Sequence, residues 1–147
     1  MGRADLDVLI VDDDDLVADA IADGVRLAGY TVCGVAGTVD DAVELMRHHR
    51  PRLALIDVDL GEGDDGIDVA RQLLEIAPLT VIFVTGYPDK IRQTDVGTAW
   101  MEKPYRVLDL INALEIVSAQ SEHRTVNIPI PQALHLVRRE KFSGGDD

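Results

Sequence analysis

Short apolar runs alternate along the chain with stretches in which apolar residues recur every three or four positions. Five of the runs are typical of strands, and four of these are almost wholly apolar, as expected for strands covered on both faces. The predicted strands are Asp7–Val11, Thr31–Val35, Leu53–Asp57, Thr80–Val84 and Thr98–Glu102. Alternation of strands and helices predicts a parallel sheet with helices on both faces, so we expect a doubly wound α/β fold.

Between the strands, the helical stretches carry recognisable boundaries. Thr38 is placed to cap the second helix, and Asp41 stands at its third position, where an acidic residue is favoured. The fourth helix is expected to be short, because Pro88 precedes it and Gly97 ends it, which leaves about two turns over Asp89–Val96. The predicted helices span residues 17–28, 39–49, 67–76, 89–96 and 106–119.

Residues 120–147 do not follow this rhythm. They begin with a short extended piece that contains Pro129 and Pro131, continue with a short helical pattern, and end in a stretch typical of disorder. We therefore assign residues 1–119 to one domain and treat 120–147 as a tail.

Composition narrows the setting of this domain. Fourteen Lys and Arg against 27 Asp and Glu give a net charge of −13, which argues against nucleic-acid binding. The one cysteine, Cys33, lies in an apolar run and cannot form an internal disulfide, which fits the core of a protein in a reducing compartment. No apolar stretch approaches the roughly 18–20 residues that cross a bilayer. We expect a cytoplasmic protein that neither binds nucleic acid nor inserts into a membrane.

Chemically active side chains follow four of the predicted strands at their carboxyl ends, where open parallel sheets bind ligands. They are Asp12 and Asp13, Asp57 and Asp59, Thr85, and Lys103. Carboxylates about 5 Å apart repel by about 3 kcal/mol per pair at an effective dielectric near 20, and a divalent cation removes this cost. Mg²⁺ binds in this way and completes its shell with phosphate oxygens. One carboxylate could then attack a phosphoryl group, while Thr85 and Lys103 hold the remaining phosphoryl oxygens.

The motifs "LIVDDD", "LALIDVDL", "FVTGY" and "MEKPY", in this order and spacing over about residues 7–118, resemble the receiver domain of two-component response regulators. The resemblance implies a flavodoxin-like fold with five parallel strands. It makes Asp57 the phosphoacceptor and Lys103 the phosphate-binding lysine. The Lys103–Pro104 peptide bond is often cis in this family. The implied Mg²⁺ ligands are Asp13, Asp57 and the backbone carbonyl of Asp59, and Asp12 is the other member of the acid pair. The implied switch positions are Thr85 and Trp100, and Tyr87 is a switch or rim residue.

Three features depart from the family pattern. Gly61 stands where a proline is usual, the loop "GEGDDG" is one residue longer, and the span from Thr85 to Lys103 is several residues shorter. The motif "FVTGY" is similar to the signature of the FAT GUY group of single-domain receivers. That group is associated with histidine kinases of the HWE and HisKA2 type and with bacterial stress signalling.

The expected function is that of a single-domain response regulator. A sensor histidine kinase, or a phosphotransfer protein, would phosphorylate Asp57 with Mg²⁺, and output would be a contact with a downstream protein or a second copy of the chain. Such a protein is not a turnover enzyme. The alternative is a haloacid-dehalogenase-type phosphatase that uses Asp57 and Asp59, although Gly61 stands where that family has a hydroxyl residue. A third reading, a binding module that ignores phosphorylation, is disfavoured by the full set of acids, hydroxyl and lysine.

Overall fold

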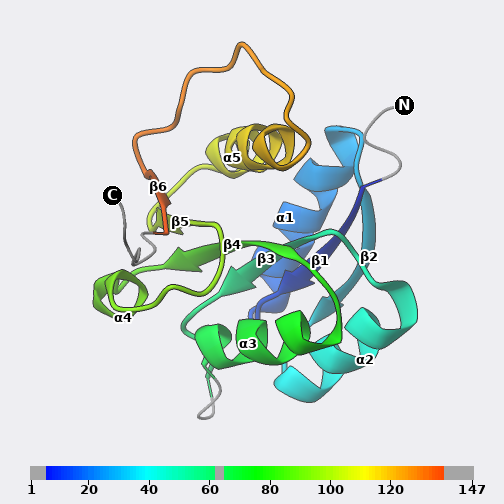
Figure 1. Cartoon of the computed structure of the whole chain (residues 1–147). Coiled ribbons are helices and arrows are strands. Elements are labelled where there is room, and N and C mark those ends of the chain that lie inside the picture. The colour runs from blue at the N-terminus through cyan, green and yellow to red at the C-terminus, as the bar shows by residue number, and fades with distance from the viewer. Residues whose placement is uncertain (1–5, 62–64, 138–147) are drawn as a thin grey trace, which may run out of the picture.

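The computed structural model describes residues 6–61 and 65–137. A six-stranded sheet in the order β2-β1-β3-β4-β5-β6 forms the middle layer, between two layers of helices (Figure 1). The first five strands run parallel, and β6 is antiparallel to β5. The strands are β1 Asp7–Val11, β2 Thr31–Ala36, β3 Leu53–Asp57, β4 Thr80–Thr85, β5 Ala99–Glu102 and β6 Leu134–Leu136. This is the predicted doubly wound α/β fold, with one strand more than expected.

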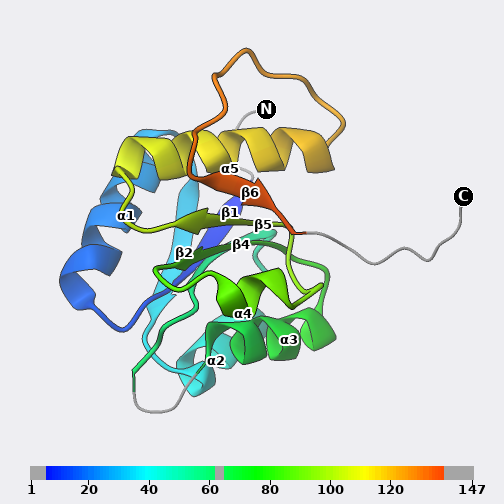
Figure 2. The same cartoon turned by 90° about the vertical axis from the view of Figure 1, so that its left-hand side faces the viewer.

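The helices pack against the sheet through two separate apolar clusters. One cluster joins a face of the sheet to α1 and α5, and the other joins the opposite face to α2, α3 and α4. The same division is visible in Figure 2, where α1 and α5 lie on one side of the strands. The helices are α1 Asp15–Leu27, α2 Val39–His49, α3 Gly66–Ile76, α4 Asp89–Arg92 and α5 Val107–Ser121.

Acidic and hydroxyl side chains start three of these helices. Asp14 accepts hydrogen bonds from the amides of Leu16 and Val17, so it caps α1. The predicted cap at Thr38 is confirmed, since its hydroxyl accepts from the Asp41 amide at 3.2 Å. Asp65, from an acidic pair in the loop before α3, caps that helix. Each cap places the start of a helix beside a strand end.

The helix α4 is shorter than the predicted 89–96. It ends at Arg92, and the following backbone is satisfied by a side chain, because the Val96 amide donates to the Thr94 hydroxyl at 3.1 Å. Threonine hydroxyls compete in this way with helical hydrogen bonds. Ile91, 2% exposed, anchors the short helix to the core.

The expectation of a short helix in the tail is wrong for its described part. Residues 122–133 contain neither helix nor strand, and Leu134–Leu136 then forms β6. The edge of β5 offers unpaired backbone groups, and pairing with them satisfies the tail better than an isolated helical turn would. The expectation of disorder at the C-terminal end falls on residues outside the described range.

Two further findings concern the setting of the domain. Among the described residues, no helix has both the length and the apolar character needed to span a membrane. Cys33 lies half-buried where the β1–β2 pairing skips one residue, and burial raises the pKa of its thiol to about 11. It packs against the core, as predicted.

Candidate functional site

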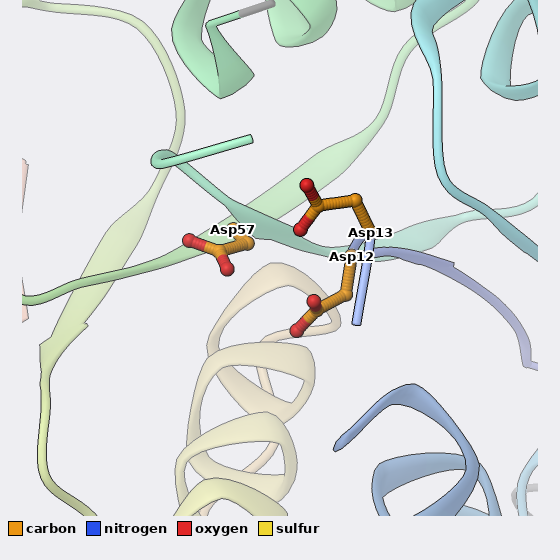
Figure 3. Close-up of side chains that lie close together, drawn as sticks. All are labelled: Asp12, Asp13 and Asp57. Atoms are coloured by element: carbon orange, nitrogen blue, oxygen red, sulfur yellow. The ribbon is translucent and has the colours of Figure 1, made fainter. Parts of the chain in front are cut away.

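Three carboxylates converge at the carboxyl ends of the neighbouring strands β1 and β3. Asp12 and Asp13 directly follow β1, and Asp57 is the last residue of β3; the register pairs Val11 with Ile56, which brings these positions side by side. One oxygen of each carboxylate lies within 4.8 Å of the others. Figure 3 shows the three side chains grouped at this point. The predicted acid cluster is therefore present.

Burial makes this cluster electrostatically costly. Asp12 and Asp57 are only 5% and 6% exposed. Desolvation, opposed by the hydrogen bond from the Asp14 amide and reinforced by the charge of Asp57, raises the pKa of Asp12 to about 6. The pKa of Asp57 is also raised, again by desolvation, although the Asp59 amide and Lys103 oppose the shift. A cation would relieve both penalties at once.

Backbone amides orient the carboxylates. The Asp14 amide donates to Asp12 and the Asp59 amide donates to Asp57, each at 2.9 Å. Asp13 accepts from the Gly61 amide at 2.8 Å. This last contact gives a physical reason for the departure from the family pattern, because a proline at position 61 would have no amide hydrogen to donate.

The start of α3 is packed directly on the backbone of β3. A Cβ atom at Gly66 would collide with the carbonyl oxygen of Asp57, and the Gly66 amide donates to the carbonyl of Val58 at 3.0 Å. Glycine is required there for steric reasons alone. The close approach fixes the strand end that carries Asp57.

Thr85, the last residue of β4, and Lys103, directly after β5, lie beside these acids at the same edge of the sheet. The Lys103 Nζ atom lies 3.1 Å from Asp57 Oδ2, and the Lys103 amide donates to the Thr85 carbonyl at 2.8 Å. The Lys103–Pro104 peptide bond is cis, as the family resemblance implied. The predicted lysine thus reaches the predicted phosphoacceptor.

The Thr85 hydroxyl is held away from Asp57. It is fully buried, donates to Asp59 Oδ2 at 3.1 Å and accepts from the Tyr87 amide at 2.9 Å. The Gly86 amide also faces Asp59 Oδ2, at 3.4 Å. The Asp59 carboxylate is therefore directed to the β4 end rather than to the acid cluster; its backbone carbonyl as a metal ligand stays a prediction.

A cavity of about 600 Å³ opens beside the acids. It is lined by the carboxylates and Lys103, and also by Val17 and Ile21 of α1 and by Tyr105. Burial and then the charges of Asp12 and Asp57 raise the pKa of the Tyr105 phenol to about 12. The cavity can thus admit a polar group whose carrier presents apolar surface.

The two remaining predicted residues lie outside this cavity. Tyr87 is 74% exposed beyond the end of β4, whereas Trp100 is buried in β5 and stacks on His135. Their roles as switch residues stay predictions. Sequence reasoning missed the Gly61 amide, Tyr105 and His135; only the position of Tyr105 next to "EKP" could have indicated it.

The fold and the site together define a phosphoacceptor-type signalling domain, and sequence comparison agrees. The family model of the response regulator receiver domain matches residues 8–115, so the chain belongs to this family. The transcriptional regulatory protein PdtaR of Mycobacterium tuberculosis is 37% identical over 113 residues, which are 74% of this chain and 55% of PdtaR. The chain thus spans about half the length of this relative.

Solved structures give the same result. The N-terminal domain of a response regulator/sensory box/GGDEF protein from Carboxydothermus hydrogenoformans has a TM-score of 0.69 and 32% identity, over 80% of this chain and 97% of that one. The anti-anti-sigma factor PhyR from Bartonella quintana has a TM-score of 0.71 and 28% identity, over 80% of this chain and 49% of that one.

Proposed function

We propose that this receiver domain is phosphorylated on Asp57 in the presence of Mg²⁺, with a phosphohistidine of a kinase or phosphotransfer protein as the donor. The observation that carries the proposal is the convergence of Asp12 and Asp13 with Asp57, whose second carboxylate oxygen contacts Lys103. A divalent cation suits this cluster, because burial raises the pKa values of two of its three acids, Asp12 and Asp57. When bound, Mg²⁺ would neutralise charge on the incoming phosphoryl group.

The transfer itself needs little from the protein beyond positioning. A carboxylate oxygen of Asp57 attacks phosphorus, the P–N bond to the donor histidine breaks, and the imidazole leaves and takes up a proton as the acyl phosphate forms. The amide of Asp59 and the ammonium of Lys103 hold the Asp57 carboxylate in place. Lys103 then pairs with the phosphoryl oxygens, because it already lies beside the attacking group.

Output is proposed to be a protein contact. The net charge of −13 disfavours nucleic acid as the target. The anti-anti-sigma factor PhyR, about half of which matches this fold, is named for an action on other proteins. Kinases of the HWE or HisKA2 type are the proposed donors on the strength of "FVTGY", residues 83–87.

The phosphatase alternative gains no support from the geometry. Its second aspartate would act as acid and base on the leaving group, whereas the Asp59 carboxylate is engaged by the Thr85 hydroxyl and the Gly86 amide. No sustained turnover of a phosphomonoester is expected from this arrangement.

Intact-mass spectrometry after incubation with acetyl phosphate and Mg²⁺ tests the assignment. We expect one added phosphoryl group in the wild type, none in Asp57→Ala, and normal labelling in Asp68→Asn, whose carboxylate lies on exposed α3 surface. A phosphorylated kinase or phosphotransfer domain in place of acetyl phosphate tests the donor class. Persistent single labelling of Asp57→Ala would move the nucleophile, with Asp59 as the first residue to examine.

A further inference from the structure

The outer edge of β5 is covered by a segment from the tail. β6 lies beside β5 and pairs antiparallel with it (Figure 2). In this pairing Trp100 stands opposite His135. Two more backbone hydrogen bonds flank the pairing, from the Glu102 amide to the Ala133 carbonyl at 3.2 Å and from the Val137 amide to the Thr98 carbonyl at 3.0 Å. The tail thus pairs with backbone groups of this edge that would otherwise be open to a strand of another protein.

Side chains reinforce the pairing at its centre. The rings of Trp100 and His135 stack with centroids 4.2 Å apart and planes 19° apart. On the α4 side, the Arg92 guanidinium lies 5.9 Å from the centre of the Trp100 ring. Around this stack lies a cavity of about 370 Å³, lined by these three residues with Ile91 and Leu136. The edge therefore holds a planar side chain, His135, with the aliphatic Leu134 and Leu136 on either side of it along β6.

The short β6 is able to detach from β5. β6 has three residues, and the connection from residue 122 to 133 contains no buried residue and no regular structure. Its apolar contacts are few: Val137, directly after β6, is buried, and Ala133 and Leu134 are partly buried against the core. Short elements with few such contacts open at a small fraction of the free energy of global unfolding. Detachment of β6 would leave α5, which ends at Ser121, in place.

β5 connects this edge to the phosphorylation site. Glu102, which bonds to Ala133 of the tail, precedes Lys103, which contacts Asp57. A shift of Lys103 toward a phosphoryl group would therefore act directly on the backbone bond that anchors the start of β6. Glu102 is the last residue of β5, and Lys103 follows it directly.

We propose that the β5 edge around Trp100 is an interaction surface for an extended segment of a partner protein, and that β6 occupies it until phosphorylation of Asp57 weakens its hold. The partner segment would add as an antiparallel strand and place an aromatic or histidine side chain, flanked by aliphatic residues, against Trp100. The dependence on phosphorylation rests on the proposed function, whereas the interaction surface itself does not.

Hydrogen exchange and a peptide probe test the proposal. The probe is a labelled peptide with the sequence PQALHLV, identical to residues 131–137, and its binding is followed by anisotropy. In His135→Ala without phosphate, we expect residues 134–137 to exchange at least about tenfold faster and the probe to bind at least about tenfold more tightly than in the wild type. His123→Ala is the matched control, because His123 lies on the exposed connection.

Mg²⁺ with beryllofluoride should produce the same opening in the wild type, and Trp100, the one tryptophan of the chain, should report it by a change in fluorescence. If Asp57 is labelled by mass yet beryllofluoride leaves residues 134–137 protected, the coupling is wrong. If His135→Ala binds no probe, or instead forms a dimer as concentration rises, the partner surface is wrong. If His135→Ala opens and binds the probe while Asp57 accepts no phosphoryl group, the surface stands and the proposed function falls.

Discussion

Half of the site stands on β1 and β3, and the other half on β4 and β5, and the fold holds these halves differently. β1 and β3 are flanked by strands on both sides. α1 begins at Asp15, shortly after Asp12 and Asp13, and Gly66, the first residue of α3, packs against the backbone carbonyl of Asp57. β4 is followed by the four-residue α4, and the outer edge of β5 is paired with the three-residue β6. The acid half is thus bordered by long helices, whereas the half that carries Thr85, Lys103 and Trp100, although buried itself, is bordered by two short elements, α4 and β6.

This difference suits a switch. Charge must be held at one place before any ligand arrives, because pre-organised groups need no rearrangement when the phosphoryl group is transferred. The response to that transfer, in contrast, requires elements whose two arrangements differ little in free energy. The molecule separates the two requirements by strand.

The largest effect is expected in the acid half. Asp13→Asn removes one of three converging carboxylates, and Mg²⁺ affinity should fall on the order of a hundredfold, about 3 kcal/mol. Isothermal calorimetry measures the affinity directly. The increase in Tm that Mg²⁺ gives the wild type should also vanish, since binding to the folded state alone stabilises it. Asp15→Asn, in the exposed first turn of α1, should behave as the wild type. Equal affinity in both variants would contradict the metal assignment.

The second effect is the pH dependence of stability that Asp12 imposes. Its pKa is raised from 3.8 to about 6, so between these values the folded protein keeps a proton that the unfolded chain has lost. The free energy of unfolding should therefore fall as pH rises through this window, by about 3 kcal/mol in total at 1.4 kcal/mol per unit. Urea unfolding in EDTA, compared with Asp12→Asn, isolates this contribution. Saturating Mg²⁺ should abolish the fall, and a wild-type slope equal to that of the variant would contradict it.

The strands of the acid half were easier to predict from the sequence than those of the other half. The bounds of β1 and β3 agree with the prediction to the residue, because a strand buried on both faces is an apolar run with charged residues at its ends. β6 was missed: "PQALHLV" fits one turn of helix as well as a strand, and its strand state depends on the β5 edge, far away in sequence.

The site shows the same limit. The positions of Asp57 and Lys103 follow from strand ends, but the direction of a side chain depends on partners from other loops. The Asp59 carboxylate could face the metal or β4, and only the fold brings Thr85 within 3.1 Å of it. The Gly61 amide acquires its role in the same way, through a contact with Asp13 across 48 positions of sequence.

The third prediction concerns that contact between Asp59 and Thr85, which crosses between the halves. Thr85 must break its hydrogen bond to Asp59 before its hydroxyl can donate to a phosphoryl oxygen, at a cost of about 1 kcal/mol. Asp59→Ala should therefore raise beryllofluoride affinity about fivefold, as measured by fluorescence titration in Mg²⁺. In the background of Thr85→Val, the same substitution should change nothing. An equal gain in both backgrounds would mean that Asp59 acts through its charge alone.

The smallest effect is expected in residues 88–97, which lie between β4 and β5. Ile91 is buried, but α4 has only four residues and the amides of Arg92, Gln93 and Thr94 bond locally within the segment. A helix this short is marginal without packing. The salt bridge from Lys90 to Asp65, 3.3 Å long, is 60% exposed on the lysine side and adds little.

These residues should accordingly exchange their amide hydrogens faster than β3 in the free protein. With Mg²⁺ and beryllofluoride they should gain a few-fold protection, because movement of Thr85 toward the phosphoryl group draws in the segment that follows it. Residues 53–57 serve as the internal reference, since all five are buried. Lys90→Ala should leave the exchange rates unchanged. If residues 88–97 are already as protected as β3 without phosphate, this segment belongs with the fixed half of the molecule, and β5 and β6 alone carry the response.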